Sequence, residues 1–333
     1  MSRETIEHLN TQTLIGYTSK RGHAWHYRAD AQGTEPNHYP TAIPVADIYR
    51  RLFNWSPLEA EVRAVAITED GVLNVTDPTR KAIVRSDTGD ILGIFKDGYQ
   101  VHKYDEWLVR NVETILDADL QVGSAGLLQG GAVAWVQVEM EDTLEVDGVE
   151  FRPFLTAATS LNGTLASTYI TGAQVVVCDN TLSAALGTFD NRIKIKHSRH
   201  SLGKIDDVRD ALGIIHGVGD AFTAQVQQLM NETVDAARWD RFVAAFTAPN
   251  SDGKRAETNA QDKAVALQRM WHHDDRVAPW AGTAFGVLSA VNTWTHHEAE
   301  VRGADRATRN TERVVFGKVD ALDANTLKVL ATV

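Results

Sequence analysis

The fold is decided by one stretch, residues 154–201, which reads FLTAATSLNGTLASTYITGAQVVVCDNTLSAALGTFDNRIKIKHSRHS. Within it, Asn162-Gly163 lies between two runs rich in Thr, Ala, Leu and Tyr. Asn-Gly readily adopts the positive φ angles of a type I′ turn, which makes it a strong hairpin signal. The sequence therefore predicts that two strands of a central sheet meet at Asn162-Gly163. The apolar run ending at Cys178 predicts another strand, and Asp179 or Asn180 can cap a short helix after it.

The end of this stretch alternates strictly between cationic and other side chains. Successive side chains of a strand point to opposite faces of the sheet, so the odd and even positions separate. One set is Arg192, Lys194 and Lys196, and the other is Ile193, Ile195 and His197. The alternation predicts a strand with a cationic face, on a sheet whose other face is buried. No catalytic motif lies in the stretch.

The chain before this stretch also predicts strands. Between Glu61 and Val101, the apolar runs VRAVAI, GVLNV, KAIVR and ILGIF are separated by Glu-Asp-Gly, Thr-Asp-Pro and Ser-Asp-Thr-Gly-Asp, which are typical of turns. Asp105 to Leu116 predicts a helix, because its large apolar residues cluster on one side. Gly130-Gly131 and Asp147-Gly148 then predict two more hairpins, so we expect an antiparallel meander.

After Lys204 the apolar period becomes helical. A seam from Ile205 to Leu229 predicts a long amphipathic helix. The later helices are predicted at Asp235–Ala248, Arg255–His273, Pro279–Val301 and Asn325–Ala331. The predicted fold class is α+β, with a largely antiparallel meander sheet followed by a helical C-terminal half. We predict three parts: an N-terminal arm with a short helix in residues 1–60, a sheet domain with one helix in 61–201, and a helical region packed on the sheet in 202–333.

The composition is that of a globular protein. The chain has 333 residues, 43% of them hydrophobic and 23% charged, with a formal net charge of −11. Such an acidic balance argues mildly against nucleic acid as a partner, so only local basic clusters can support that function. Cys178 is the only cysteine, which excludes an intramolecular disulfide. With a polar start and no apolar run of about 20 residues, we expect no membrane contact and a cytoplasmic location.

The candidate catalytic and metal-binding groups are weak. His272-His273 and His296-His297 are adjacent pairs, and adjacent residues of a helix point about 100° apart, so they chelate one ion poorly. Cys178 with His197 could form a nucleophile and base, although a lone cysteine in an apolar run is usually packing. Phosphate-loop and serine-hydrolase motifs are absent from the sequence. We predict no catalytic residues, no metal and no cofactor.

Basic clusters are the stronger functional signal. The first has no acid between Arg192 and Ile205. It contains Arg192, Lys194, Lys196, His197, Arg199 and Lys204. The second is Arg302, Arg306, Arg309 and Arg313, whose spacing places all four on one face of a helix. The third interleaves Trp25 with Lys20, Arg21, His23, His26 and Arg28. Cationic grooves with aromatic side chains are typical of single-stranded nucleic-acid binding, because cations neutralise phosphates and bases stack on rings. The alternative without a binding function is that these clusters are solvated basic faces whose charge nearby acids balance.

The motif TGAQVVVCDNTL at residues 171–182, followed by RIKIKH at 192–197, resembles phage- and plasmid-like proteins of a large domain-of-unknown-function family. Further segments agree in order: AWH at 24–26, VRSDTG at 84–89, GYQV at 98–101, GTAFGVLSAVN at 282–292 and VFGK at 315–318. Many relatives have Ser-His-Asp-Gly-Ser at the central hairpin, where this chain has SLNGT at 160–164, and an Arg where Gln174 stands. The resemblance implies a phage, prophage or plasmid context and no established activity.

These observations favour a DNA-handling protein that is not an enzyme. We expect it to bind single-stranded DNA or to assist annealing in recombination or replication, and to assemble as a homo-oligomer. The first alternative is an enzyme of unknown chemistry around Cys178 and His197. The second is a phage accessory protein that binds a host protein through its helical half.

Overall fold

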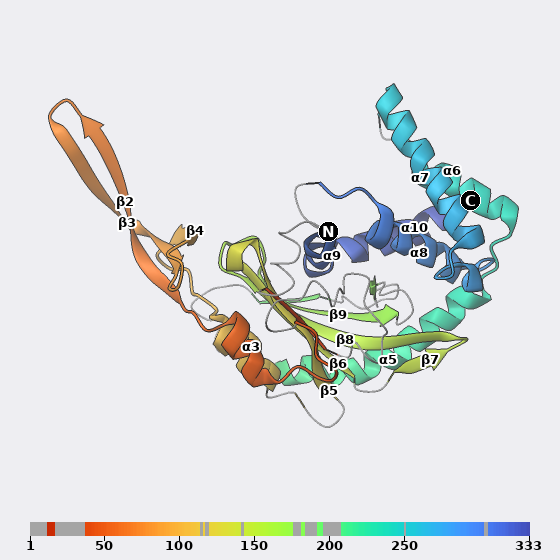
Figure 1. The fold of residues 1–333 in the computed structure, drawn as a ribbon, viewed down its shortest axis with the longest axis horizontal. Helices are drawn as coiled ribbons and strands as arrows, with labels where there is room; N and C mark the ends of the chain where they lie inside the picture. The colour runs from red at the N-terminus through yellow and green to blue at the C-terminus, as the bar shows by residue number, and fades with distance from the viewer. Residues whose placement is uncertain are drawn as a thin grey trace.

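A computed structural model describes residues 12–16, 37–113, 116, 120–140, 143–175, 181–183, 192–195, 208–249, 251–302 and 306–333. Within these ranges, an antiparallel sheet forms the centre of the molecule (Figure 1). Its strands run in the order β1-β5-β6-β8-β9-β10, with β11 also paired to β9 and β7 to β8. Their bounds are β1 Thr13–Ile15, β5 Leu120–Leu128, β6 Val133–Met140, β7 Leu144–Val146, β8 Val149–Ser160, β9 Ser167–Val175, β10 Thr181–Ser183 and β11 Arg192–Ile195.

Three predicted hairpins connect these strands. Between β5 and β6 the chain turns through η3, Gln129–Gly131. Between β7 and β8, Asp147 and Gly148 have φ angles of 49° and 78°, so this two-residue turn has the positive φ angles of type I′. Asn162-Gly163 does join β8 to β9, as predicted, but within a longer connection, residues 161–166. There, the Asn162 side chain accepts a hydrogen bond of 3.0 Å from the Thr164 N–H, which stabilises the bend.

A second sheet projects away from this centre (Figure 1). It consists of β2 Pro57–Thr68, β3 Gly71–Arg85 and β4 Ile91–Lys96. The prediction that Thr76-Asp77-Pro78 is a turn was wrong, because these residues lie inside β3. Val62 pairs with Asp77 and Glu61 with Lys81, so residues 78–80 form a bulge with no partner on β2. A bulge accommodates Pro78, which has no N–H to donate to a ladder. We call the antiparallel pair β2–β3 the ribbon.

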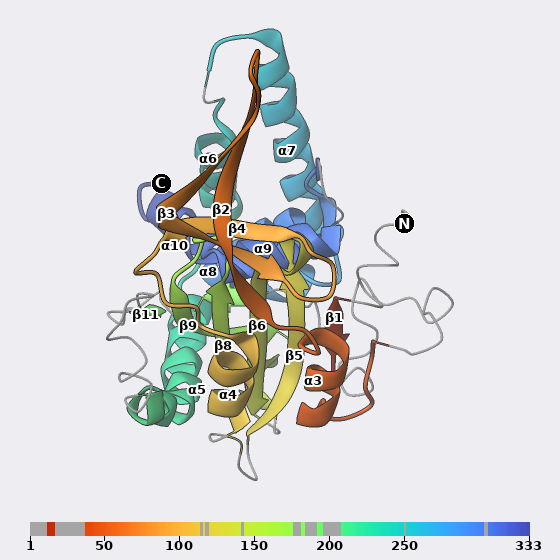
Figure 2. The same ribbon diagram turned by 90° about the vertical axis from the view of Figure 1, so that its left-hand side faces the viewer.

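Helices cover both faces of the main sheet. On one face, α3 Val45–Leu52, η2 Asp105–Arg110 and α4 Asn111–Glu113 cover the middle of the sheet, and α5 Val208–Asn231 covers the β7–β8 end (Figure 2). Val136 of β6 packs on this side with Trp107, and Phe151 of β8 packs against Phe222 of α5 at 4.6 Å between ring centroids. Val133 faces the other way and packs with Val315 of α9 Arg306–Val315. Both faces of β6 are therefore buried.

The remaining helices form the C-terminal half. They are α6 Ala236–Thr247, α7 Lys254–His273, η6 Ala278–Trp280, α8 Ala284–Thr293, η7 Trp294–Glu298 and α10 Lys318–Leu330. The single predicted helix from Pro279 to Val301 is interrupted, because Gly282 has a φ of 95° and Thr283 caps α8 by accepting from the Gly286 N–H. All of α8 is buried. The α+β prediction is confirmed, and the last helix is longer than Asn325–Ala331.

Candidate functional site

Strand β11 places two members of the first basic cluster, Arg192 and Lys194, at the side of the main sheet. It pairs antiparallel with β9, and position 192 is opposite Ile170 while position 194 is opposite Thr168. β10 pairs with the next part of β9, so β10 and β11 share one edge of β9. The strand predicted for residues 192–197 is thus confirmed from Arg192 to Ile195. Lys196, His197, Arg199 and Lys204 lie outside the described residues, as do Cys178 and the third basic cluster.

The second basic cluster lies at the C-terminal end of η7. Arg306 donates to the carbonyl oxygens of His296 and Ala299 at 3.3 and 3.1 Å. Arg313 donates to the Thr295 carbonyl at 2.6 Å. Carbonyls at a helix C-terminus lack helical partners and carry partial negative charge, so cations stabilise them. Partial burial lowers the pKa values of both guanidiniums from their ordinary value. These two arginines hold a helix end together.

The other members of the second cluster also have partners within the chain. Arg302 forms an ion pair with Glu300 at 2.7 Å. Arg309 forms one with Glu312 at 2.8 Å and donates to the Arg302 carbonyl at 3.0 Å. Arg302 lies before α9, while Arg306, Arg309 and Arg313 lie on it with the predicted helical spacing. A phosphate would have to compete with these contacts at each position.

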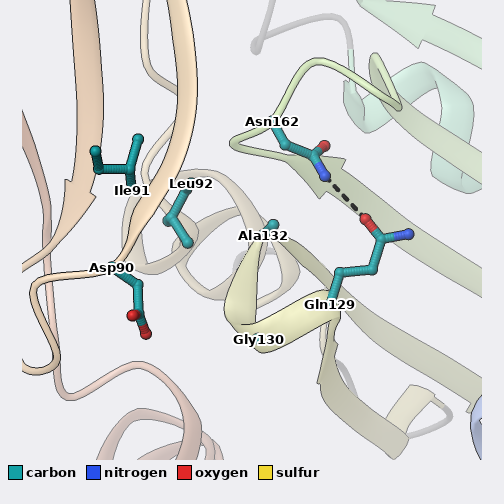
Figure 3. A pocket seen from close by; sticks show the side chains of 7 residues that line it. All are labelled: Asp90, Ile91, Leu92, Gln129, Gly130, Ala132 and Asn162. Atoms are coloured by element: carbon teal, nitrogen blue, oxygen red, sulfur yellow. Dashed lines mark hydrogen bonds between the residues drawn. The ribbon is translucent and has the colours of Figure 1, made fainter. Parts of the chain in front are cut away.

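A polar cleft lies where the start of β4 and the turn before it meet the tips of two hairpins (Figure 3). Its volume is about 390 Å³. Its lining residues are Asp90, Ile91, Leu92, Gln129, Gly130, Ala132 and Asn162. Asn162 Nδ2 donates to Gln129 Oε1 at 2.8 Å, which joins the β8–β9 connection to η3. Asn162, which the sequence marked as a turn residue, is therefore also a wall of this cleft.

The ribbon root is fixed beside this cleft by a group of aromatic and charged contacts. The guanidinium of Arg85 lies 4.2 Å from the Trp55 ring centroid and donates to the Gly130 carbonyl at 2.8 Å. It also holds the Asp87 carboxylate at 2.7 Å, which lowers the pKa of that carboxyl. The Tyr104 hydroxyl donates to the Gly131 carbonyl at 2.8 Å. The ribbon is thus anchored at its root.

One buried histidine contacts a serine in the core. His102 Nδ1 lies 2.7 Å from Ser167 Oγ, which in turn lies 2.8 Å from Thr159 Oγ1. His102 is 1% exposed, and Ser167 and Thr159 are fully buried. A nucleophile and base must reach a substrate, so this chain of contacts is typical of a satisfied core network. Sequence reasoning missed it, because the residues are far apart in the chain.

One histidine of the second adjacent pair lies in the core. His296 is buried, and its Nδ1 lies 2.9 Å from the Asn292 carbonyl oxygen. Burial lowers the pKa of His296 to about 4. Glu298 forms an ion pair with Arg269, and Asp274 forms one with Arg276.

Within the described part of the chain, no group of three or more His, Cys, Asp or Glu residues has metal-binding geometry. Among the helices of that part, none has the length and apolar character needed to cross a membrane.

Comparison with known proteins identifies the family. The family model described as Domain of unknown function (DUF932) matches residues 91–315. The match begins at β4, so it includes the main sheet from β5 onward and the helices as far as α9, whereas β2 and β3 lie before it. No curated protein and no solved structure matches the chain. The chain belongs to the DUF932 family.

Proposed function

We propose that this DUF932 protein handles DNA, binding single strands without catalysis in recombination or replication of a phage or plasmid, in the host cytoplasm. The observation that carries the proposal is the location of Arg192 and Lys194 at alternate positions of β11, the strand beside β9. Alternate positions lie on the same face of a strand, about 7 Å apart, which is close to the spacing of phosphates along an extended single strand. Cations at that spacing favour a polyanion.

The basic segment continues beyond the strand. No acid occurs between Arg192 and Ile205, and Lys196, His197, Arg199 and Lys204 extend the charge. The second cluster contributes less in this proposal, because Arg306 and Arg313 already bind carbonyls of η7. We therefore assign the main phosphate contacts to residues 192–204 and only a peripheral role to Arg302 and Arg309.

The test measures binding of a fluorescent oligothymidine across a series of salt concentrations. Lys194→Ala with Lys196→Ala should weaken binding of any sequence about equally. The slope of log K against log salt should fall by about 0.7 for each phosphate that the variant no longer neutralises. The matched control is Arg63→Ala with Arg80→Ala, which removes two exposed cations from the ribbon and should leave the slope unchanged. No binding by the parent at low salt would refute the proposal.

A second arm of the test separates structural arginines from binding arginines. Arg306→Ala leaves carbonyls at the end of η7 without their donor, which should cost about 1–3 kcal/mol of stability. Its oligonucleotide affinity, measured below the melting temperature, should stay within twofold of the parent. A large loss of affinity in a fully folded Arg306→Ala protein would move the binding surface to α9.

The enzyme alternative rests on Cys178 and His197, which lie outside the described residues. It predicts that Cys178→Ala abolishes turnover of a small substrate, whereas the DNA-handling proposal predicts that this variant binds oligonucleotide as the parent does. The host-protein alternative gains support from exposed apolar residues, although these lie mainly on the ribbon rather than on the helical half.

A further inference from the structure

The amide side chains of Asn162 and Gln129 are held in one arrangement at the wall of the cleft beside β4 (Figure 3). Asn162 Oδ1 accepts hydrogen bonds from the N–H and the hydroxyl of Thr164, at 3.0 and 2.5 Å. Because a backbone N–H can only donate, this contact identifies the oxygen of the Asn162 amide. Asn162 Nδ2 is therefore the atom that donates to Gln129 Oε1, at 2.8 Å. We call these two side chains the amide pair.

The amide pair offers a donor next to an acceptor. An amide nitrogen carries two hydrogens, and a carbonyl oxygen has two lone pairs. The bond between the two side chains uses one of each, and no other described residue binds Asn162 Nδ2 or Gln129 Oε1. One N–H and one lone pair therefore remain for a ligand, on atoms that lie 2.8 Å apart.

The backbone around Gln129 holds the acceptor of the amide pair in place. Gln129 has a φ of 53° and Gly130 a φ of 68°, so both lie in the left-handed region. This conformation is uncommon for residues other than glycine, and residues held in it cluster at functional sites. Arg85 donates to the Gly130 carbonyl at 2.8 Å while its guanidinium lies over the Trp55 ring. The acceptor therefore comes from a turn that is anchored on its other side.

The other lining residues indicate the class of ligand. Ile91, Leu92 and Ala132 are apolar, and Asp90 is the only charged residue that lines the cleft in the described part of the chain. One carboxylate and no cation disfavour a phosphate. A nucleobase fits better, because its faces pack on apolar side chains and its Watson–Crick edge carries a donor beside an acceptor. The volume of about 390 Å³ is within the range of small-molecule sites.

The cleft lies at the end of the main sheet to which the basic strand leads. β11 runs antiparallel to β9, and Ile195 is opposite Ser167, the first residue of β9. The connection 161–166, which contains Asn162, comes directly before Ser167. β9 lies between β8 and β11, so these two strands are roughly 10 Å apart. A single strand bound along β11 therefore has its next nucleotides beside the cleft.

We propose that the cleft binds one unstacked base of the single strand whose phosphates contact residues 192–204, with the amide pair hydrogen-bonded to its Watson–Crick edge. This site rests on the proposed DNA-handling function and adds a base contact to it. Because all four bases carry a donor beside an acceptor on that edge, the site accepts any of them. The phosphate contacts give the salt dependence, and the cleft adds affinity that salt changes little.

The experiment compares a fluorescent oligothymidine with an abasic oligomer of the same length, which keeps every phosphate and lacks the bases. The parent should bind oligothymidine at least about fivefold more tightly, as expected for one well-placed pair of hydrogen bonds. Gln129→Ala removes the acceptor of the amide pair at an exposed position, so the variant should fold as the parent does. Its affinity should fall about fivefold for oligothymidine and stay within about twofold for the abasic oligomer.

The matched control is Gln261→Ala, which truncates another exposed glutamine, on α7 and outside the cleft. This variant should bind both oligomers as the parent does. Neither variant removes a cation, so the slope of log K against log salt should be the same in all three proteins. Circular dichroism and the melting temperature check that each variant is folded.

The outcomes separate this site from the DNA-handling proposal. A parent that binds no oligothymidine at low salt would refute both. A parent that binds the two oligomers equally, with a normal salt slope, would refute the base site alone. Unchanged oligothymidine affinity in Gln129→Ala would leave the cleft to another ligand, such as a peptide backbone. An equal loss for both oligomers would mean that the cleft contacts the sugar-phosphate backbone rather than a base.

Discussion

The ribbon and the main sheet are both antiparallel and both rich in Val, Ile, Leu and Ala, yet they differ in what covers them. β6 is buried on both faces, with Val136 against η2 on one side and Val133 against α9 on the other. In the ribbon, Val65 and Ile67 on one face and Leu73 on the other are exposed. The same local chemistry therefore stabilises the fold in one place and provides an open surface in the other. Helices packed against the sheet make the difference.

The largest expected effect is on the free energy of unfolding, and it should differ between a variant of the main sheet and a variant of the ribbon. Phe222 of α5 is 2% exposed and packs on Phe151 of the main sheet. Phe222→Ala should reduce the free energy of unfolding by about 3–5 kcal/mol, because it removes buried apolar area and leaves a cavity. Ile67→Ala on the ribbon should change it by less than about 0.5 kcal/mol. Urea unfolding measures both, and similar values for the two variants would contradict the comparison.

The second prediction concerns pH. Burial lowers the folded-state pKa of His296 to about 4, whereas an unfolded histidine has a pKa of about 6.5. As the pH falls, the unfolded chain therefore binds a proton at His296 before the folded protein does. The free energy of unfolding keeps its full value above pH 6.5 and decreases as the pH drops toward 4. The full loss is about 3 kcal/mol.

The control for the pH prediction is His296→Gln, which removes the titrating group. Urea unfolding of parent and variant at several pH values should show the parent losing more stability below pH 6.5. Equal slopes in the two proteins would mean that His296 does not titrate as its burial implies. The ribbon strands contain no histidine, so this acid sensitivity belongs to the rest of the molecule, which we call the body.

A smaller effect on stability is expected at the turn between β7 and β8. Gly148 has a φ of 78°, a conformation that other residues adopt at a cost. Gly148→Ala should destabilise the protein by about 1 kcal/mol. Gly98 is exposed, has open space around it and lacks a positive φ, so Gly98→Ala should be neutral or slightly stabilising. Thermal unfolding compares the two, and a destabilising Gly98→Ala would show that its loop needs glycine as well.

The smallest effect is expected from shortening the ribbon. Val62 and Asp77 are partners across it, so an Asn-Gly turn can replace residues 63–76. At low protein concentration the body should keep its free energy of unfolding within about 0.5 kcal/mol. All eight tryptophans lie outside the deleted segment, so their fluorescence reports on the body. A loss of several kcal/mol would mean that the ribbon stabilises the main sheet.

Local chemistry predicted much of the fold. Asp147-Gly148 and Asn162-Gly163 mark hairpins in both sequence and structure, because the φ angles these residues tolerate are a local property. The helices after Lys204 follow from apolar periodicity. The turn predicted at Thr76-Asp77-Pro78 was wrong, because the same residues that favour a turn are also compatible with a bulge within a long strand.

The sequence predicted less of the cleft and of the contacts made by the second basic cluster. Asn162 and Gln129 line one cleft only because the tips of two separate hairpins meet beside β4. Arg306 and Arg313 resemble a basic stripe in the sequence, and the carbonyls that bind them come from another element, η7. Alternation over residues 192–197 did predict a strand, which the structure shows from Arg192 to Ile195, because that pattern depends only on neighbouring residues.

The pairing of β1 with β5 bears on the order in which the chain assembles. Thr13 lies opposite Gly126, so the ribbon and α3 intervene between the two paired strands. Contacts between residues distant in sequence close a large loop, and their entropic cost delays them. Of the described strands, β1 leaves the ribosome before the others; Ile15 can bridge His38 early, but the ladder of β1 with β5 cannot form until β5 has followed. The hairpins β5–β6 and β7–β8 join neighbouring segments and can form earlier, so β1, the first of the described strands, is among the last to complete its ladder.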